Sequence, residues 1–141
     1  MKKEKLSPEK SNKTFDFRTI TSFEKACEKE NLDPMALPEV SMIPEEFRKA
    51  IIGAYKLFII FKAINNGWIA RMGDASQLKY EPWLRVLSSG CGFGSSICVC
   101  DYTYTAVGSR LCTFSPEAAI YIGKQFGEKG SEYRDFFLKT E

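Results

Sequence analysis

The strongest constraint on the fold is a long stripe of apolar residues at helical spacing between Pro44 and Gly67. Pro44 suits the first turn of a helix, and two glutamates follow it where negative charge favours the helix dipole. The sequence Asn65-Asn66-Gly67 is typical of a left-handed helix end. The stripe consists of Phe47, Ile51, Tyr55, Phe58 and Ile59, widened by Ala50, Ala54 and Phe61. The pattern predicts a central helix whose stripe packs in the core.

Shorter elements are predicted on both sides of this helix. A helix begins at Thr21 or Ser22 and ends before Pro34, and another begins at Ser115-Pro116-Glu117, with serine as N-cap and proline in the first turn. Between them, three segments read as short strands: Tyr80–Ser88, Ile97–Tyr104 and Arg110–Phe114. The glycine-rich run Ser88–Ser96 is predicted as a loop or bulge. The expected fold is α+β, with a small antiparallel sheet of about three to four strands packed against two to three helices.

Length and composition favour one domain in a reducing compartment. The chain has 141 residues, enough for one core, and residues 15–141 are predicted as a single α+β domain after a disordered basic tail at 1–14. The longest apolar run, Leu57–Phe61, is far shorter than the roughly 20 residues of a membrane span. No apolar segment follows the basic N-terminus, and the five cysteines are an odd number, so we expect free thiols and a cytosolic location.

Charge and composition argue against two functional classes. Residues 1–13 hold five lysines and two glutamates, so most of the net charge of +2 lies in the tail, and the rest of the chain is close to neutral. A domain that grips nucleic acid usually has a strongly basic surface, so nucleic-acid binding is possible but not favoured. The chain contains no histidine, which removes the commonest general base and metal ligand. We therefore expect a protein that is not an enzyme.

The cysteines and glycines give no clear cofactor site. The closest cysteine pair, Cys98-Val99-Cys100, does not have the two-to-four-residue spacing usual for zinc ligands, and buried thiols are the better interpretation. The glycine-rich run lacks the Gly-Lys-Ser/Thr of a phosphate-binding P-loop. No metal and no cofactor are predicted.

Aromatic and cationic residues between 67 and 110 form the candidate binding site. Aromatic faces next to Arg or Lys can stack a base and hold a phosphate. The alternative is that the tryptophans fill the core, that lysine and arginine lie along its edge, and that an Arg–Asp pair locks the turn. The candidate residues are Trp68, Lys79, Tyr80, Trp83 and Arg85, with Ser109 and Arg110 in a second patch.

Several short motifs along the chain occur together in one protein family. They are Asn66-Gly67-Trp68, Gln77-x-Lys79-Tyr80-x-Pro82-Trp83, Val107-Gly108-Ser109-Arg110-Leu111-Cys112-x-Phe114 and Gly123-Lys124-Gln125-Phe126. With Thr21-x-Phe23-Glu24-x-Ala26-Cys27, this combination resembles a family of small uncharacterised proteins of Bacteroides-type bacteria and their phages and prophages. Where relatives have Pro-Asp-Trp, this chain has Ile69-Ala70-Arg71-Met72. The resemblance implies a phage or mobile-element setting and transfers no activity.

Together these features favour a phage-type accessory binding protein in the bacterial cytosol. Its partner would be a host or phage protein or a small anionic, nucleotide-like ligand, and an anti-defence role would suit the setting. A structural or virion-associated assembly protein, with a homo-oligomer as one possible form, is the first alternative. A nucleic-acid-binding protein is the second, and an enzyme using Cys, Asp or Arg is the third.

Overall fold

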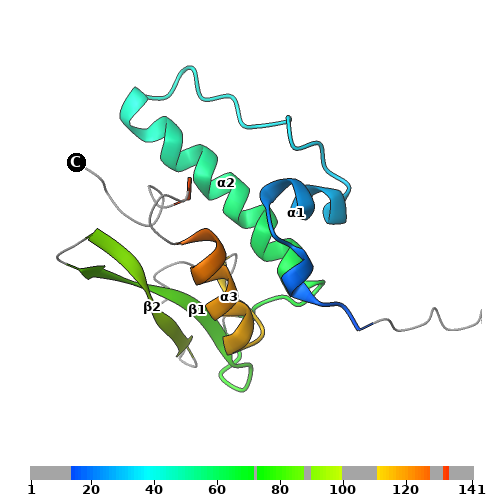
Figure 1. Cartoon of the computed structure of the whole chain (residues 1–141). Helices are drawn as coiled ribbons and strands as arrows, with labels where there is room; N and C mark the ends of the chain where they lie inside the picture. Colours follow the sequence, from blue (N-terminus) through cyan, green and yellow to red (C-terminus); the bar gives the residue numbers. More distant parts are fainter. Residues whose placement is uncertain (1–13, 72, 88–89, 100–110, 128–131, 134–141) are drawn as a thin grey trace, which may run out of the picture.

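The computed structural model describes residues 14–71, 73–87, 90–99, 111–127 and 132–133, and within 83–99 it describes the backbone alone. The elements follow the order η1, α1, α2, β1, β2 and α3 (Figure 1). Their bounds are η1 Phe17–Thr19, α1 Phe23–Glu30, α2 Glu45–Asn65, β1 Lys79–Leu87, β2 Gly90–Val99 and α3 Pro116–Phe126. The predicted tail therefore lies almost wholly outside the described residues.

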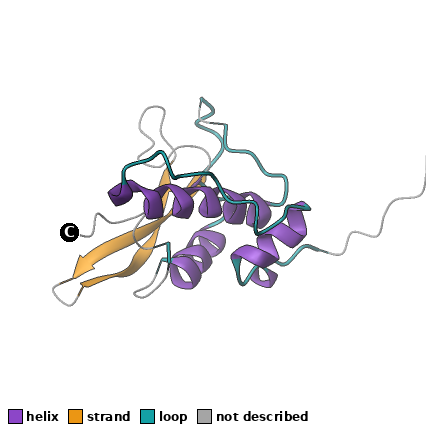
Figure 2. Cartoon of the chain, turned by 90° about the horizontal axis from the view of Figure 1, so that it is seen from above, coloured by secondary structure: helices purple, strands orange, loops and turns teal. Residues whose placement is uncertain are grey.

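The long helix α2 runs through the middle of the molecule, as the sequence predicts. Seen from above, α1 and α3 lie on the same side of α2, and the β1–β2 hairpin lies next to α3 (Figure 2). One core cluster joins the three helices, with Phe23 from α1, Leu57 and Phe61 from α2, and Ile122 and Phe126 from α3. The strands therefore flank a helical core.

The buried face of α2 differs from the predicted stripe. Leu57, Ile60 and Ile64 are fully buried, whereas Phe47 and Phe58 are exposed. This helix carries apolar residues around most of its circumference, so helical spacing alone fits more than one face. Contact with α1 and α3 selects the face, and the sequence pattern does not contain that information.

The predicted starts of α1 and α3 are confirmed by their serine caps, whereas Pro44 directly precedes α2 instead of lying in its first turn. The hydroxyl of Ser22 accepts a hydrogen bond from the backbone nitrogen of Lys25 at 3.3 Å, and that of Ser115 accepts one from Ala118 at 3.1 Å. Pro116 occupies the first turn of α3. Each hydroxyl satisfies a backbone donor that has no partner inside its helix.

The prediction of a three-to-four-stranded sheet is wrong for the residues that the structure describes. These contain two strands, paired antiparallel from Lys79↔Val99 to Leu87↔Gly90, with an irregularity between Trp83 and Leu84. The predicted strand at residues 110–114 contributes a single bridge, between Tyr80 and Thr113, and residues 100–104 of another lie outside the description.

The glycine-rich run corrects one half of its prediction and confirms the other. Residues 90–96 of the run belong to β2 and are not a loop. The register passes from Trp83↔Ser95 to Leu84↔Phe93 and skips Gly94, which is the irregularity expected of the predicted bulge. Strand pairing is made by the backbone, which glycine supplies as well as any residue. In the register, Gly92 lies opposite Arg85 and Gly90 opposite Leu87. The low strand preference of glycine misled the prediction.

None of the helices in the described ranges combines the length and the apolar character of a membrane-spanning helix.

Candidate functional site

The most suitable site in the described residues is an open pocket of about 300 Å³ at the C-terminal end of α2, which we call the Trp68 pocket. Most of its wall is apolar, and it also holds one cation and one amide. The lining residues are Phe58, Ile59, Lys62, Asn65, Trp68, Ile69 and Ala70. It contains one of the tryptophans that the sequence singles out.

Helix geometry and a chain reversal build this pocket. Phe58, Lys62 and Asn65 are spaced by one and two turns, so they share one face of α2. After the helix, Asn66 and Gly67 adopt positive φ angles of 46° and 90°. The backbone nitrogen of Trp68 then donates to the carbonyl of Asn65 at 2.9 Å. This reversal returns the chain to the pocket-forming face of the helix.

The side chain of Gln77 fixes the segment that carries the pocket's second wall. Its Oε1 accepts a hydrogen bond from the backbone nitrogen of Arg71 at 2.6 Å, and its Nε2 donates to the carbonyl of Ile69 at 2.9 Å. The two bonds bracket Ala70, which lines the pocket. An irregular segment clamped in this way offers a preformed surface, which lowers the entropic cost of binding.

Asn65 is the most unusual residue in the wall. It is 8% exposed, and its Nδ2 donates to the backbone carbonyl of Cys112 at 2.8 Å, which fixes the orientation of the amide. Its Oδ1 is buried and has no hydrogen-bond partner among the residues that the structure describes. A buried acceptor in that state costs roughly 1–3 kcal/mol, so the bond to Cys112 holds the amide in place against this cost.

Charges at the rim favour an anion. The side chain of Lys62 is 66% exposed, and its Nζ lies 3.0 Å from Glu30 Oε2. Lys29 Nζ lies 3.8 Å from the other oxygen of the same carboxylate. One carboxylate is thus shared by two lysines, which leaves a net positive charge beside the pocket. The Glu30 side chain is only 14% exposed, but that of Lys62 lies largely in water, so an incoming anion can share its ammonium with Glu30.

The structure separates the predicted site residues. Trp68 is half-buried and lines the pocket. Lys79 is 1% exposed, and its Nζ donates to the carbonyls of Asp74 at 2.9 Å and Gln77 at 2.7 Å. Tyr80 exchanges backbone hydrogen bonds with Thr113. Lys79 and Tyr80 are not among the residues that line the Trp68 pocket.

The remaining candidates fall in parts of the chain whose side chains lie outside the description. Trp83 and Arg85 lie on β1 within the part where only the backbone is described, and Ser109 and Arg110 lie outside the described residues. No group of three or more Cys, Asp or Glu side chains suited to a metal ion occurs among the residues that are described.

The two described thiols are poorly placed for nucleophilic chemistry. Cys112 is fully buried, and its Sγ donates to Glu81 Oε1 at 3.6 Å. Burial, followed by the nearby Glu81 carboxylate, raises the pKa of Cys112 to about 12. Burial also raises the pKa of Cys27. Because the thiolate is the reactive form, both thiols are unreactive at neutral pH.

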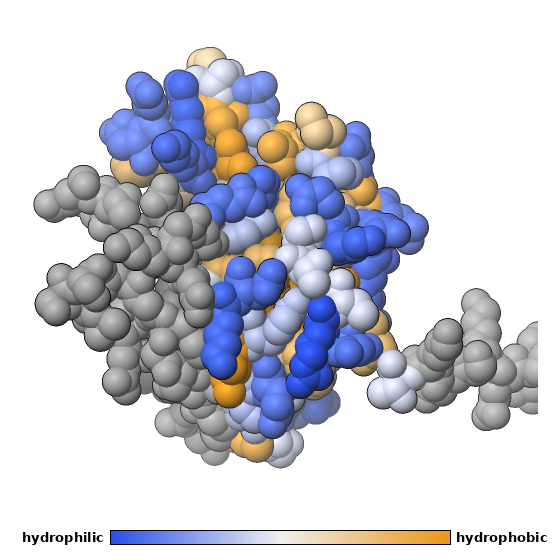
Figure 3. Space-filling model, in the orientation of Figure 1, coloured by the Kyte–Doolittle hydropathy of each residue, from blue (hydrophilic) through white to orange (hydrophobic). Residues whose placement is uncertain are grey.

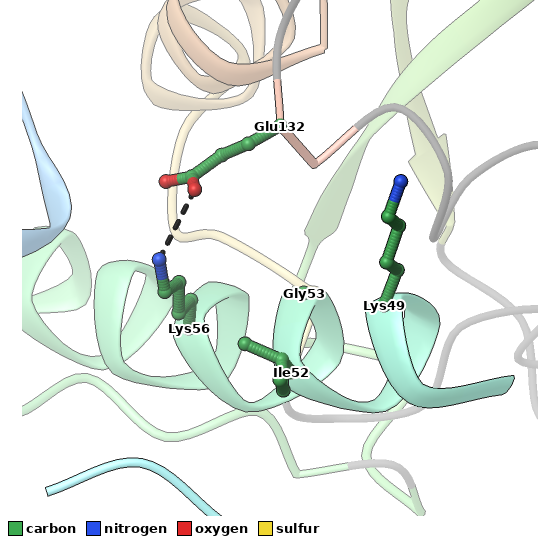
Figure 4. A pocket seen from close by; sticks show the side chains of 5 residues that line it. All are labelled: Lys49, Ile52, Gly53, Lys56 and Glu132. Atoms are coloured by element: carbon green, nitrogen blue, oxygen red, sulfur yellow. Dashed lines mark hydrogen bonds and ion pairs between the residues drawn. The ribbon is translucent and has the colours of Figure 1, made fainter. Parts of the chain in front are cut away.

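A second pocket lies between α2 and the 132–133 turn (Figure 4). It is lined by Lys49, Ile52, Gly53, Lys56 and Glu132. The ammonium of Lys56 is bound to Glu132 at 3.1 Å and lies 5.2 Å from the centre of the Phe23 ring. The residues that line this second pocket include no aromatic side chain, so it offers less to a flat ring than the Trp68 pocket does.

Sequence reasoning missed Lys62 and Asn65 as site residues. It used Asn65 as part of a helix-end signal and Lys62 as one lysine within an apolar stripe. The available signal was their spacing, because a lysine and an amide three residues apart share a helix face that leads directly to Trp68.

Comparison with known proteins gives no relative. No protein-family model matches the chain. No curated protein matches it, and no solved structure does either. The geometry of the Trp68 pocket is therefore the basis on which a function can be inferred.

Proposed function

We propose that this protein is a non-enzymatic binding protein that captures a small, anionic, nucleotide-like ligand in the Trp68 pocket. The observation that carries the proposal is that one apolar pocket brings together two aromatic side chains, Trp68 and Phe58, and the cationic side chain of Lys62. A planar ring and a negative charge are the two ligand features that these groups complement.

The apolar wall suits a flat ring. Trp68 and Phe58 are large aromatic side chains, and Ile59 and Ile69 add aliphatic surface. Stacking of a base on an aromatic side chain contributes roughly 1–3 kcal/mol to binding. A volume of about 300 Å³ is at the lower end of the range for small-molecule sites. The pocket therefore fits a mononucleotide better than a larger cofactor.

The cation at the rim suits the rest of such a ligand. A phosphate would pair with the ammonium of Lys62, whose side chain is 66% exposed. In the phage setting that the resemblance implies, capture in the host cytosol would withhold a nucleotide from host defence.

Calorimetric titration of the full chain with AMP, GMP, CMP and UMP tests the proposal. We expect at least one of the four to bind, and Lys62→Gln to weaken that binding about tenfold through loss of one charge-assisted hydrogen bond. Lys124→Gln, which removes an exposed lysine on α3, is the matched control and should not change the affinity.

Trp68→Leu should abolish the binding that Lys62→Gln weakens, because it removes the stacking surface. Material released by denaturing the protein from its natural host should contain a nucleotide. If none of the four nucleotides binds and none is released, the proposal is wrong. Equal binding by wild type, Lys62→Gln and Trp68→Leu would also contradict it.

A further inference from the structure

The segment between α1 and α2 presents large apolar side chains to solvent. Met35 is 83% exposed and Met42 is 93% exposed, and Leu37 and Phe47 are also exposed. The segment runs back beside α2 to its first turn (Figures 1 and 2). Over this part of the molecule, hydrophobic side chains are interspersed with hydrophilic ones (Figure 3). Large apolar side chains exposed repeatedly along one segment are typical of interaction surfaces.

Hydrogen bonds hold this segment in one shape although it has no regular secondary structure. The guanidinium of Arg48 donates from Nε to the carbonyl of Ile43 at 2.7 Å and from Nη2 to the carbonyl of Ser41 at 2.9 Å. At the other end, the backbone nitrogen of Met35 donates to Asp33 Oδ1 at 2.9 Å. The exposed side chains therefore stand on a fixed backbone, which reduces the ordering cost of binding a partner.

The charge of the segment is predominantly negative, since the Arg48 guanidinium bound to its backbone is outnumbered by carboxylates. Residues 31–46 contain no lysine or arginine. Their four acidic side chains, Asp33, Glu39, Glu45 and Glu46, are all exposed. Carboxylates at this density repel nucleic-acid phosphates and anionic lipid headgroups, and they attract a cationic partner.

We infer that residues 31–47 form a docking surface for a basic, amphipathic helix of a partner protein. The methionine and leucine side chains would contact the apolar face of the helix, and the four carboxylates would pair with flanking lysines or arginines. Met35 and Met42 are at most about 25 Å apart, given the reach of an extended chain, which corresponds to a helix of roughly 16 residues. This surface is separate from the Trp68 pocket and does not depend on it.

Titration of the full chain with the basic amphipathic peptide LKKLLKLLKKLLKL tests the inference, with LEELLELLEELLEL as the acidic counterpart. We expect the basic peptide to bind and become helical, and the acidic peptide not to bind. The double variant Met35→Ser/Met42→Ser should weaken binding at least tenfold. It should keep the wild-type unfolding midpoint, because both side chains already lie in water.

Two further variants separate the apolar and the charge contributions. Leu78→Ser, which changes an exposed apolar side chain elsewhere, should leave the peptide affinity unchanged. Glu45→Gln/Glu46→Gln should weaken binding and reduce its dependence on salt. The inference fails if the methionine variant binds the basic peptide as wild type does. It also fails if sedimentation shows that the surface is covered by a second copy, as a dimer that the methionine variant dissociates.

Discussion

The side-chain amide nitrogen of Asn65 donates a 2.8 Å hydrogen bond to the backbone carbonyl of Cys112, a residue 47 positions later in the chain. Thr113, the next residue, exchanges two backbone hydrogen bonds with Tyr80 on β1. The end of α2 is therefore tied to the strand through a short segment at 112–113. The same amide forms part of the Trp68 pocket, so the pocket wall and the joint between helix and strand share one residue.

Asn65→Asp tests this joint. The substitution replaces the donor facing the Cys112 carbonyl with an acceptor and buries a carboxyl group, so we expect a loss of about 3 kcal/mol in the free energy of unfolding at pH 7. Burial should raise the pKa of the new carboxyl above its unfolded value. Its protonated form can donate, so the loss should be smaller at pH 4.5 than at pH 7. Urea unfolding at the two pH values measures this.

The neighbouring residue provides the control for that experiment. Asn66 is exposed, and its Oδ1 accepts a 2.8 Å hydrogen bond from Lys29 Nζ, which an aspartate oxygen can accept equally well. Asn66→Asp should change stability by less than about 0.5 kcal/mol. A cost for Asn65→Asp that is equal at both pH values, or no greater than that of Asn66→Asp, would contradict the role given to the amide.

The sequence specified the helices more reliably than the sheet, for physical reasons that particular residues show. Ser22 and Ser115 cap helices through local bonds, so local sequence is sufficient to place them. Gly90 and Gly92 lie in β2 because their backbone pairs with Leu87 and Arg85 of the preceding strand, which the low strand preference of glycine does not indicate. Lys79 is one of the predicted ligand residues, and in the structure its buried ammonium donates to the carbonyls of Asp74 and Gln77.

Of the residues that line the Trp68 pocket, the sequence pointed to Trp68 alone. The pocket residues on α2 were not predicted as site residues. Aromatic and cationic residue types drew attention to Trp68, whereas only the spacing of Asn65 from Lys62 could have indicated its place in the pocket. The bond from Asn65 to Cys112, 47 positions away, has no signature in the local sequence.

Glu81→Gln should stabilise the protein at neutral pH. Glu81 is almost fully buried, and burial raises the pKa of its carboxyl, with the thiol bond from Cys112 acting in the opposite direction. The pKa of Glu81 in the folded protein lies above the unfolded value of about 4.3. The contribution of Glu81 to the free energy of unfolding is therefore lost as pH rises through the folded pKa and the buried carboxyl ionises. The neutral amide avoids this loss and still accepts the thiol hydrogen bond.

The pH dependence distinguishes this effect from a general one. We expect Glu81→Gln to gain about 1 kcal/mol over wild type at pH 7 and nothing at pH 4, measured by urea unfolding. Glu117→Gln changes an exposed carboxylate on α3 and should show no such gain at pH 7. The prediction is refuted if Glu81→Gln has a lower free energy of unfolding than wild type at pH 7 and no such deficit at pH 4.

Gly67→Ala should destabilise the protein and deform the Trp68 pocket. Gly67 has a φ of +90°, and a Cβ there would meet no atom within 4 Å, so the cost is backbone strain and not a clash. We expect a loss of about 1–2 kcal/mol in the free energy of unfolding. Gly73 also has open space where a Cβ would lie, but it has no positive φ. Gly73→Ala should therefore be neutral or stabilising by up to about 1 kcal/mol, and equal effects at the two sites would contradict the assignment.

Cys112 should resist alkylation in the folded protein. Its side chain is fully buried and its pKa is raised to about 12, so at pH 8 less than about one thiol in a thousand is ionised, from the distance between pH and pKa. Modification by iodoacetamide should therefore occur only as fast as the molecule opens, and peptide mass spectrometry can follow it. Labelling should become complete in urea. Rapid labelling of Cys112 in the native protein would indicate an accessible thiolate beside Glu81 and would support a cysteine-dependent enzyme in place of a binding protein.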